Sequence, residues 1–426
     1  MRFTRPRGTN DFFGDRMERL FEGEGTLTAY LRRCGYREIR TPIFESTELF
    51  TRAVGEGTDI VTKEMYTFVD KKGRSLTLRP ENTAPVMRAY LENGLQRAGG
   101  IARFYYLGPM FRYDRPQAGR YRQFHQIGAE AIGSPGPAVD AEIIDVSLGL
   151  YRALGFPALE VRLNSVGCPT CRARYREVLT ARLAELTGEL CDTCCERTGI
   201  NPLRIFDCKE CDAVKRKLPF ITDHLCDECR AHFERLQGLL GDMRISYTVD
   251  PLLVRGLDYY TKTAFEIIHP GLGSQNALCG GGRYDGLAED CGGPPIPAVG
   301  FSAGMERLME VAPDDFVHGK RERESDVYIA VLDDGMASQA LSAARALRDR
   351  GIAALVDLSA RSLKKQLKAA SDSGSAISII VGLAELEPGM VAVKSMGTGE
   401  QAAVHSRDLV SRIETELERA RGGHSA

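Results

Sequence analysis

The chain has 426 residues, 43% of them hydrophobic and 27% charged, and its formal net charge is −2. This composition is typical of a globular protein with room for two or three domains. No run of about 18 apolar residues is present, which excludes a membrane-spanning helix. The charged start, MRFTRPRGTNDFFGDR, lacks the apolar region of a secretory signal, so we expect a cytoplasmic protein.

In chain order, the hydrophobic spacing of the first third predicts a helix, an extended segment, a second helix opening at Thr83, two strands joined by a loop, and a long amphipathic helix. These elements are expected at 16–35, 36–45, 83–95, 101–114, 121–133 and 137–155.

The segment from 164 to 245 differs in character, because CxxC pairs gather there among many charged residues. We interpret it as an inserted module. Strand-rich sequence follows at 247–269, then a glycine-rich stretch at 277–293 and a strand leading into a helix at 298–311.

A charged linker, HGKRERESD, stands at 318–326, and strands alternate with helices beyond it. This alternation predicts a small α/β domain with a largely parallel sheet. We therefore expect one domain at 1–325, which contains the module, and a second domain at 326–426.

The stretch FRYDRPQAGRYRQFHQIGAE at 111–130 concentrates arginines in a nearly neutral chain. In its second strand, alternation places charged and amide side chains on one face, with a glycine between the last two. A glycine there would let a group approach the backbone. The pattern favours the floor of a ligand site, and a solvated sheet face is the alternative. The residues on this face are Arg122, Phe124, Gln126, Gly128 and Glu130.

Two further segments favour the ligand site. TLRPENTAP places Glu81 between a strand and a helix start, where a carboxylate can meet an ammonium group. LVRGLDYYTKTAFE places Arg255 and the pair Tyr259–Tyr260 before another strand. Arginines, carboxylates and phenols of this kind suit a ligand with a phosphate, an amine and a polar ring.

Five segments in order resemble the signatures of the histidyl-tRNA synthetase family, a class II aminoacyl-tRNA synthetase family. GYREIRTPIFE resembles its dimer-interface motif, FRYDRPQAGRYRQFHQIGAE its ATP-loop motif and AVGFSAGMERL its third motif. LVRGLDYYTKTAFE and ALCGGGRYDGL resemble two signatures peculiar to this family. The resemblance implies an α+β fold: a mainly antiparallel catalytic sheet flanked by helices, a helical Cys-rich insertion and a C-terminal α/β anticodon-binding domain.

It also implies an activity: L-histidine is activated with Mg²⁺-bound ATP to histidyl-adenylate and is then transferred to the 3′ end of histidine tRNA by a homodimer. Catalytic roles would fall to Arg112, Arg255 and Arg307, and the ATP site would comprise Arg112, Asp114 and Arg307. The histidine pocket would comprise Glu81, Thr83, Gln126, Glu130, Tyr259 and Tyr260. The residues expected to contact tRNA are Arg115, Gln117, Arg120, Lys364 and Lys365.

Three positions depart from the family pattern. Asp114 stands where glutamate is frequent, Asn82 where glycine is common, and Gly280 where alanine is common. None of these changes removes a charged group that the reaction requires.

Eight cysteines form four CxxC pairs in the module, and they could build two tetrahedral Cys₄ zinc sites. Free thiols are the alternative. Since some relatives lack these cysteines, we expect any zinc to be structural, with the catalytic residues outside the module. The cysteines are Cys168, Cys171, Cys191, Cys194, Cys208, Cys211, Cys226 and Cys229.

Two other functions stay open. One is the histidine-binding regulatory subunit of ATP phosphoribosyltransferase, which shares the fold but typically lacks the C-terminal domain. The other is a synthetase for a different amino acid.

In the C-terminal domain, RSLKKQLKAA is expected to form a helix with a basic side made by Arg361, Lys364, Lys365 and Lys368. This side is interpreted as a contact for the anticodon arm, with a solvated face as the alternative.

Overall fold

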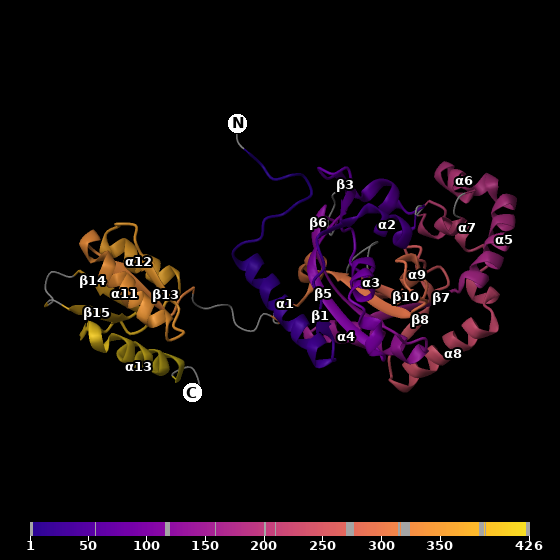
Figure 1. Cartoon of the computed structure of the whole chain (residues 1–426). Helices are drawn as coiled ribbons and strands as arrows, with labels where there is room; N and C mark the ends of the chain where they lie inside the picture. Colours follow the sequence, from indigo (N-terminus) through magenta and orange to yellow (C-terminus); the bar gives the residue numbers. More distant parts are fainter. Residues whose placement is uncertain are drawn as a thin grey trace. The chain divides into compact units, whose positions relative to one another are not determined.

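The computed structural model describes residues 3–55, 57–115, 120–157, 159–199, 202–208, 210–269, 277–313, 316, 324–382, 387 and 389–422. The chain divides into two compact units, Met1–Val317 and His318–Ala426 (Figure 1). Within the described ranges, no helix is both long enough and apolar enough to traverse a bilayer.

The first unit is built on an eight-stranded sheet. Its neighbours are antiparallel except at the two edges, where β1 pairs with β5 and β7 with β8 in parallel. The expected mainly antiparallel sheet is thus confirmed. In spatial order the strands are β1 (Arg37–Glu38), β5 (Ala102–Phe111), β6 (Gln123–Ile132), β11 (Ala298–Gly304), β10 (Ala277–Arg283), β9 (Thr261–Ile268), β7 (Glu160–Gly167) and β8 (Tyr247–Val249).

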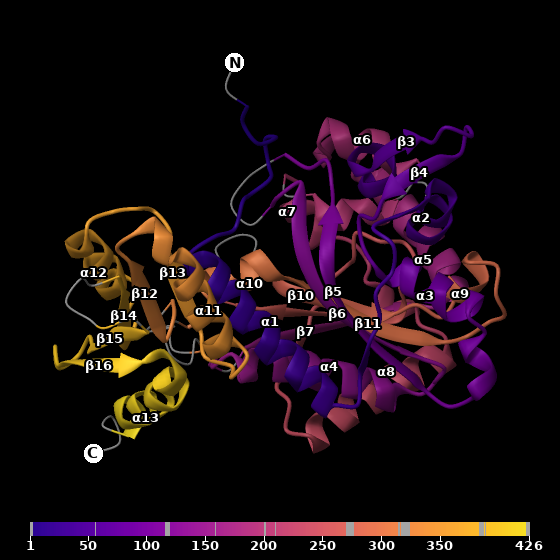
Figure 2. The same cartoon turned by 60° about the vertical axis from the view of Figure 1, so that its left-hand side comes forward.

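Helices cover one face of this sheet, and α1, α4 and α8 run along it (Figure 2). Their apolar sides meet Ile127, Ala129 and Ala131 of β6 in the main core. Because side chains alternate along a strand, Gln126, Gly128 and Glu130 project to the other face, as the sequence predicts. The helices are α1 (Asp15–Arg33), α4 (Pro137–Ala153), α8 (Asp227–Asp242) and α10 (Met305–Val311).

The opposite face lies against α3 and a second core rich in tyrosines. Helix α3 begins at Thr83 as expected. The remaining elements on this side are α2 (Thr47–Val54), the π-helical turn η1 (Ile60–Glu64), α3 (Thr83–Glu92), η2 (Leu95–Ala98) and α9 (Leu287–Asp290).

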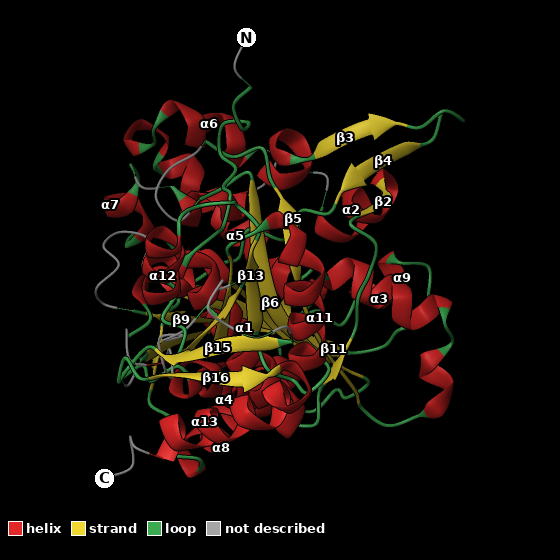
Figure 3. Cartoon of the chain, turned by 90° about the vertical axis from the view of Figure 1, so that its left-hand side faces the viewer, coloured by secondary structure: helices red, strands yellow, loops and turns green. Residues whose placement is uncertain are grey.

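A small three-stranded sheet in the order β2-β4-β3 stands beside this layer (Figure 3). Its strands are β2 (Phe44–Ser46), β3 (Tyr66–Val69) and β4 (Ser75–Leu78). Several of its apolar side chains are exposed, namely Phe44, Phe68 and Val69.

The Cys-rich module leaves the main sheet after β7 and returns to it at β8. Residues 164–167 of the expected insertion therefore belong to the sheet. The module is helical and has its own core around Tyr175, Leu179 and Phe206. Its elements before α8 are α5 (Pro169–Glu185), η3 (Thr187–Glu189), α6 (Asp192–Thr198), η4 (Pro202–Asp207), α7 (Asp212–Lys215) and η5 (Ile221–His224).

The second unit has a five-stranded sheet in the order β13-β12-β14-β15-β16. Only β12, β13 and β14 are parallel, while β14, β15 and β16 pair antiparallel. The expected largely parallel sheet is therefore wrong for its last two strands, because β15 returns directly into β16 without a crossover helix. The strands are β12 (Val327–Val331), β13 (Ala354–Asp357), β14 (Ile377–Val381), β15 (Met390–Ser395) and β16 (Gln401–His405).

Helices α11 (Ala337–Arg348), α12 (Leu363–Asp372) and α13 (Leu409–Gly422) complete this unit. Helix α12 begins later than expected, so Arg361 lies outside it. The Arg361 guanidinium instead binds the Asp357 carboxylate at 2.7 Å and Ser359 Oγ at 2.6 Å. The basic side of the helix therefore consists of Lys364, Lys365 and Lys368, all exposed.

Candidate active site

A cavity of about 540 Å³ opens on the tyrosine-rich side of the main sheet. It gathers side chains from segments far apart in the chain: the start of α3, the loop end of the β5–β6 pair, the loop before β9, and α10. Most of the expected site residues line it, namely Glu81, Thr83, Arg112, Asp114, Arg120, Gln126, Arg255, Tyr259, Tyr260 and Arg307.

The other expected residues lie elsewhere. Glu130 is 1% exposed and lies beneath the cavity. Arg115 is exposed at the end of the described part of the β5–β6 loop, and Gln117 is outside the described residues. Lys364 and Lys365 belong to the second unit.

Glu81 joins the cavity to the start of α3. Its carboxylate accepts hydrogen bonds from the backbone N–H groups of Thr83 at 2.6 Å and Ala84 at 3.1 Å, so it caps the helix. Burial raises the pKa of Glu81, and the two N–H groups oppose that shift. Gln126 stands nearby, and among the described residues its Oε1 has no hydrogen-bond partner. The Glu81 carboxylate and the Gln126 Oε1 can therefore both accept hydrogen bonds from an ammonium group.

Glu130 is held by two hydroxyl groups. Its carboxyl accepts from Thr83 Oγ1 at 2.8 Å and from the Tyr284 hydroxyl. Burial raises its pKa to about 8. The adjacent Gly128 leaves room for an aromatic ring, because a Cβ there would lie 2.4 Å from the Tyr106 hydroxyl oxygen. The close approach expected at this glycine is therefore made by the protein's own tyrosine.

Arg112 stands where β5 ends. Its Nε donates to the Pro80 carbonyl oxygen at 2.8 Å, and its guanidinium lies 5.4 Å from the ring centroid of Phe124. Burial lowers its pKa, while the nearby carboxylates of Glu64 and Glu81 oppose this. The Arg112 guanidinium is thus held through its Nε, and the side chain lines the cavity.

Arg255 comes from the loop before β9 and is paired with Glu266 of that strand. Burial alone would lower the pKa of Arg255, but the charge of Glu266 outweighs it and raises the pKa above its ordinary value. Gly280 makes this position accessible, since a Cβ there would lie 2.0 Å from the Arg255 guanidinium. An alanine at 280 would force that side chain to move.

Arg307 and Arg120 supply positive charge at the other end of the cavity. Burial lowers the pKa of Arg307, and the charge of Arg120 adds to this effect. Asp114 lies 3.2 Å from Arg120 in an ion pair. Cations are therefore spread along the cavity with carboxylates beside them, as Glu81 near Arg112 and Asp114 beside Arg120.

Asn82, one of the departures from the family pattern, is buried beside the small sheet. Its Oδ1 accepts from Thr41 Oγ1 at 2.6 Å and from Arg79 Nη1 at 3.1 Å. A glycine would lack this acceptor, so the asparagine has a structural role in this chain.

Sequence reasoning missed several residues of the site. Glu64 and Tyr121 line the cavity, Glu266 holds Arg255, and Tyr284 holds Glu130. Tyr284 and Glu266 stand inside two of the quoted motifs, but only the tertiary structure shows which groups they contact.

The module gathers its four CxxC pairs into two clusters. One joins Cys168, Cys171, Cys226 and Cys229, and the other joins Cys191, Cys194, Cys208 and Cys211; within each cluster the sulfur atoms lie within 4.8 Å of one another. No disulfide joins any of the twelve cysteines, all of which lie within the described ranges. Both clusters are thus arranged as four-sulfur sites able to hold a metal ion.

The pattern of the histidyl-tRNA synthetase family matches residues 8–193 and 200–308, and that of an anticodon-binding domain matches residues 326–416. A histidine–tRNA ligase from Halothermothrix orenii is 48% identical over 411 residues, which cover 96% of this chain and 98% of the relative. The apo structure of the Staphylococcus aureus histidyl-tRNA synthetase is 38% identical, with a TM-score of 0.78, and covers 97% of this chain and 100% of its own.

A Bacillus halodurans structure described as an ATP phosphoribosyltransferase regulatory subunit/histidyl-tRNA synthetase shares the fold at 21% identity. Its TM-score is 0.63, and the match covers 90% of this chain and 100% of that one.

The antiparallel sheet, the cavity and the anticodon-binding domain define a class II aminoacyl-tRNA synthetase. The full-length matches are more specific, and the chain belongs to the histidyl-tRNA synthetase family.

Replacing Glu130 with Gln is expected to change how stability depends on pH. The folded chain keeps a proton on this carboxyl up to about pH 8, whereas the unfolded chain releases it near the ordinary pKa of 4.5. The stabilisation from this proton is complete below that value and is lost as the pH rises toward 8. Since glutamine does not titrate, the unfolding free energy of Glu130→Gln relative to the parent should rise by roughly 4 kcal/mol across this window.

Denaturant unfolding of both proteins at several pH values measures the difference. A difference that stays constant with pH would mean that Glu130 is ionised in the folded chain.

Proposed function

We propose that the cavity of this histidine–tRNA ligase activates L-histidine with Mg²⁺-bound ATP. The carrying observation is that Arg112, Arg255 and Arg307, from three distant segments, surround one cavity that also contains Glu81 and Gln126. Both reacting groups are anionic, so their approach requires preorganised positive charge.

In the first step, a carboxylate oxygen of histidine attacks the α-phosphorus of ATP, and the bond to the β-phosphate oxygen breaks. Histidyl-adenylate forms and pyrophosphate leaves. Arg112 neutralises the α-phosphate, Arg255 neutralises the carboxylate and the α-phosphate, and Arg307 binds the ATP end. Asp114 is already in an ion pair with Arg120, so any contact of Asp114 with adenine must coexist with that pair.

In the second step, the hydroxyl of the terminal tRNA adenosine attacks the adenylate carbonyl, and AMP leaves. No side chain is assigned as general base, and the phosphate of the adenylate is the proposed proton acceptor.

The histidine pocket is proposed in the part of the cavity that Glu81, Gln126, Tyr259 and Tyr260 line. Glu81 and Gln126 receive the ammonium group, while Thr83, Tyr259 and Tyr260 line the space for the imidazole. Glu130, which projects from the same face of β6 as Gln126 but is buried, is proposed as the imidazole partner. Direct contact requires that its bond to Thr83 or Tyr284 opens when histidine binds.

The tip of the β5–β6 pair, with Arg115, Gln117 and Arg120, is proposed to meet the acceptor end of the tRNA. The second unit, 326–426, is proposed to bind the anticodon arm through Lys364 and Lys365.

The chain is proposed to act as a homodimer through the segment 36–45 and the small sheet. Exposed apolar side chains there support this proposal, with Phe44 47% exposed and Val69 68% exposed.

Each Cys cluster is proposed to hold one structural zinc ion. Tetrahedral coordination at about 2.3 Å places neighbouring sulfurs about 3.8 Å apart. The sulfurs of Cys168 and Cys171 are 3.6 Å apart, those of Cys168 and Cys226 4.0 Å, and those of Cys191 and Cys208 3.7 Å. Backbone N–H groups also point at the sulfurs, as from Cys226 to Cys171 at 3.1 Å.

A purely regulatory histidine-binding protein is the second candidate, because the Bacillus halodurans structure named for such a subunit has the same fold. That candidate does not require three arginines around a nucleotide-sized cavity. ATP–pyrophosphate exchange with a panel of amino acids separates the two functions, since only a synthetase supports exchange, and only with histidine.

The Arg255→Ala variant is expected to lose histidine-dependent exchange by several hundredfold, equivalent to roughly 3–4 kcal/mol. The reason is that the guanidinium neutralises charge that builds up during the reaction. Arg162→Ala, which removes a more exposed arginine on β7, is the control and should exchange like the parent. Near-normal exchange by folded Arg255→Ala would contradict the assigned role.

Elemental analysis of protein purified without chelator should find about two zinc ions per chain, one for each cluster. Cys194→Ser should lose the zinc of its own cluster and keep the other ion, because the two clusters share no ligand. Less than about one zinc per parent chain would favour free thiols.

Replacing Lys364 and Lys365 together with alanine should raise the KM for tRNA, flatten its dependence on salt and leave pyrophosphate exchange unchanged. Phosphate contacts release bound counterions, so each lost contact lowers the salt dependence. The control is the double alanine variant of Arg412 and Arg419, which removes the same charge from α13. If both double variants charge tRNA like the parent at every salt concentration, the basic side of α12 is only a solvated face.

A further inference from the structure

The Cys-rich module contacts the loop that carries Arg255, Tyr259 and Tyr260, hereafter the 255–260 loop. Arg172 of α5 donates from Nη1 to the Asp258 carbonyl oxygen at 3.0 Å. Arg204 of η4 donates to the Gly256 carbonyl oxygen at 3.4 Å and pairs with the Asp258 carboxylate at 3.5 Å. Two cations of the module thus hold consecutive parts of this loop.

The loop forms a wall between two cavities. Arg255, Leu257 and Tyr260 line the large cavity, and they also line a crevice of about 60 Å³ on the module side. Arg204 likewise lines both. The expected catalytic residues stand outside the module, and the fold brings η4 of the module to the rim of their cavity, which the sequence did not indicate.

Both positioning arginines are tied to the Cys clusters by sequence and by structure. Arg172 directly follows Cys171, whose partners in the first cluster include Cys226 and Cys229 at the start of α8. Arg204 lies between the two CxxC pairs of the second cluster, on the segment that joins Cys194 to Cys208. Each cluster therefore restrains the chain from which one arginine projects.

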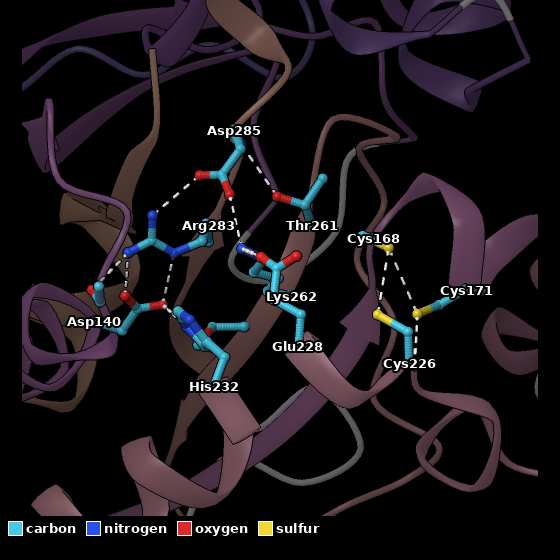
Figure 4. Close-up of polar contacts among 12 residues, drawn as sticks. Asp140, Cys168, Cys171, Cys226, Glu228, His232, Thr261, Lys262, Arg283 and Asp285 are labelled. Atoms are coloured by element: carbon cyan, nitrogen blue, oxygen red, sulfur yellow. Dashed lines mark hydrogen bonds and ion pairs between the residues drawn. The ribbon is translucent and has the colours of Figure 1, made fainter. Parts of the chain in front are cut away.

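Helix α8 holds the chain just beyond the loop as well. Glu228, adjacent to Cys229, pairs with Lys262 of β9 at 2.9 Å (Figure 4). One turn further, the His232 Nε2 lies 3.4 Å from Asp140, which is paired with the buried Arg283 of β10. The first cluster is thus joined to both ends of the segment from Asp258 to Lys262.

We propose that the metal-bound Cys clusters, through Arg172 and Arg204, hold the 255–260 loop in its histidine-binding shape. Loss of either the metal or the arginines then weakens histidine binding more than ATP binding. The inference rests on the proposed function, in which this loop contributes to the histidine pocket. ATP binding is affected less because Arg112 follows β5 and Arg307 belongs to α10, and the bonds from Arg172 and Arg204 go to the 255–260 loop.

The size of the effect follows from the contacts. A hydrogen bond from a charged group is worth roughly ten- to a hundredfold in an equilibrium constant. The hydrogen bond from Arg172 to Asp258 is partly buried, so water does not readily replace it. Removing it should shift the loop toward other conformations.

The first experiment compares Arg172→Met and Arg204→Met with the parent and with Arg174→Met. Arg174 is exposed on the same helix as Arg172 and provides a matched loss of charge. Equilibrium dialysis measures the Kd for histidine and for ATP, and hydrogen exchange measures protection of residues 255–260. Both positioning variants should bind histidine at least tenfold more weakly, with faster exchange in the loop and unchanged zinc content. ATP binding should change less than threefold, and Arg174→Met should match the parent.

The second experiment removes the metal. Cys171→Ser should lose the zinc of the first cluster, exchange amide hydrogens faster at 255–260 and bind histidine more weakly, again with ATP binding largely retained. Cys195→Ser replaces a cysteine outside both clusters and is the control. If the variants that lack zinc or a positioning arginine all bind histidine within twofold of the parent with unchanged loop protection, the inference is overturned.

The two proposals fail in different ways. A parent protein that does not support histidine-dependent pyrophosphate exchange would refute the proposed function. A parent that does support it, together with variants that bind histidine normally, would refute only the coupling between module and loop.

Discussion

The fold depends on burying charged groups along one face of an antiparallel sheet. Moving a charge out of water is costly unless a partner compensates it. Partners compensate two buried charges of this face, helix N–H groups for Glu81 and Glu266 for Arg255, while Glu130 keeps its proton and binds hydroxyl groups. The opposite face of the same strands is apolar and supplies the main core. One face therefore stabilises the unit, and the other remains available for charged ligands.

The cavity is also shaped by missing side chains. Gly128 leaves space for the Tyr106 ring, and Gly280 leaves space for the Arg255 guanidinium. At both positions a methyl group would overlap atoms of the site.

The Cys-rich module and the rest of the first unit both contact the 255–260 loop. A loop without regular structure has few internal hydrogen bonds, so its shape depends on what packs against it. Arg172 and Arg204 supply such contacts from one side, and the Asp258 N–H donates to the Val54 carbonyl oxygen at 3.1 Å from the other. The first Cys cluster joins the starts of α5 and α8, the helices that carry Arg172 and Glu228, so a metal ion bound there would tie the directions of these two helices together.

The sequence alone determined the sheet-forming pair 101–133, the helix opening at Thr83, the existence of a Cys-rich module and the order of the motifs. These features depend on periodicity and local spacing, which short segments carry by themselves. It also indicated most residues that line the cavity, because they stand in those motifs. It did not show that β16 pairs antiparallel with β15, or that Arg361 leaves the basic helix to bind Asp357.

Only the tertiary structure decided which distant groups meet. Glu266 and Arg255 stand in one motif, but only the folded chain shows that their charges pair. The enclosure of Glu130 by Thr83 and Tyr284 and the sorting of eight cysteines into two clusters join segments that no local pattern relates. The contact of Arg204 with the 255–260 loop belongs to the same class. Contacts of this kind arise from how the chain packs over long sequence separations, and the physical information that specifies them is the shape and charge of surfaces that exist only after folding.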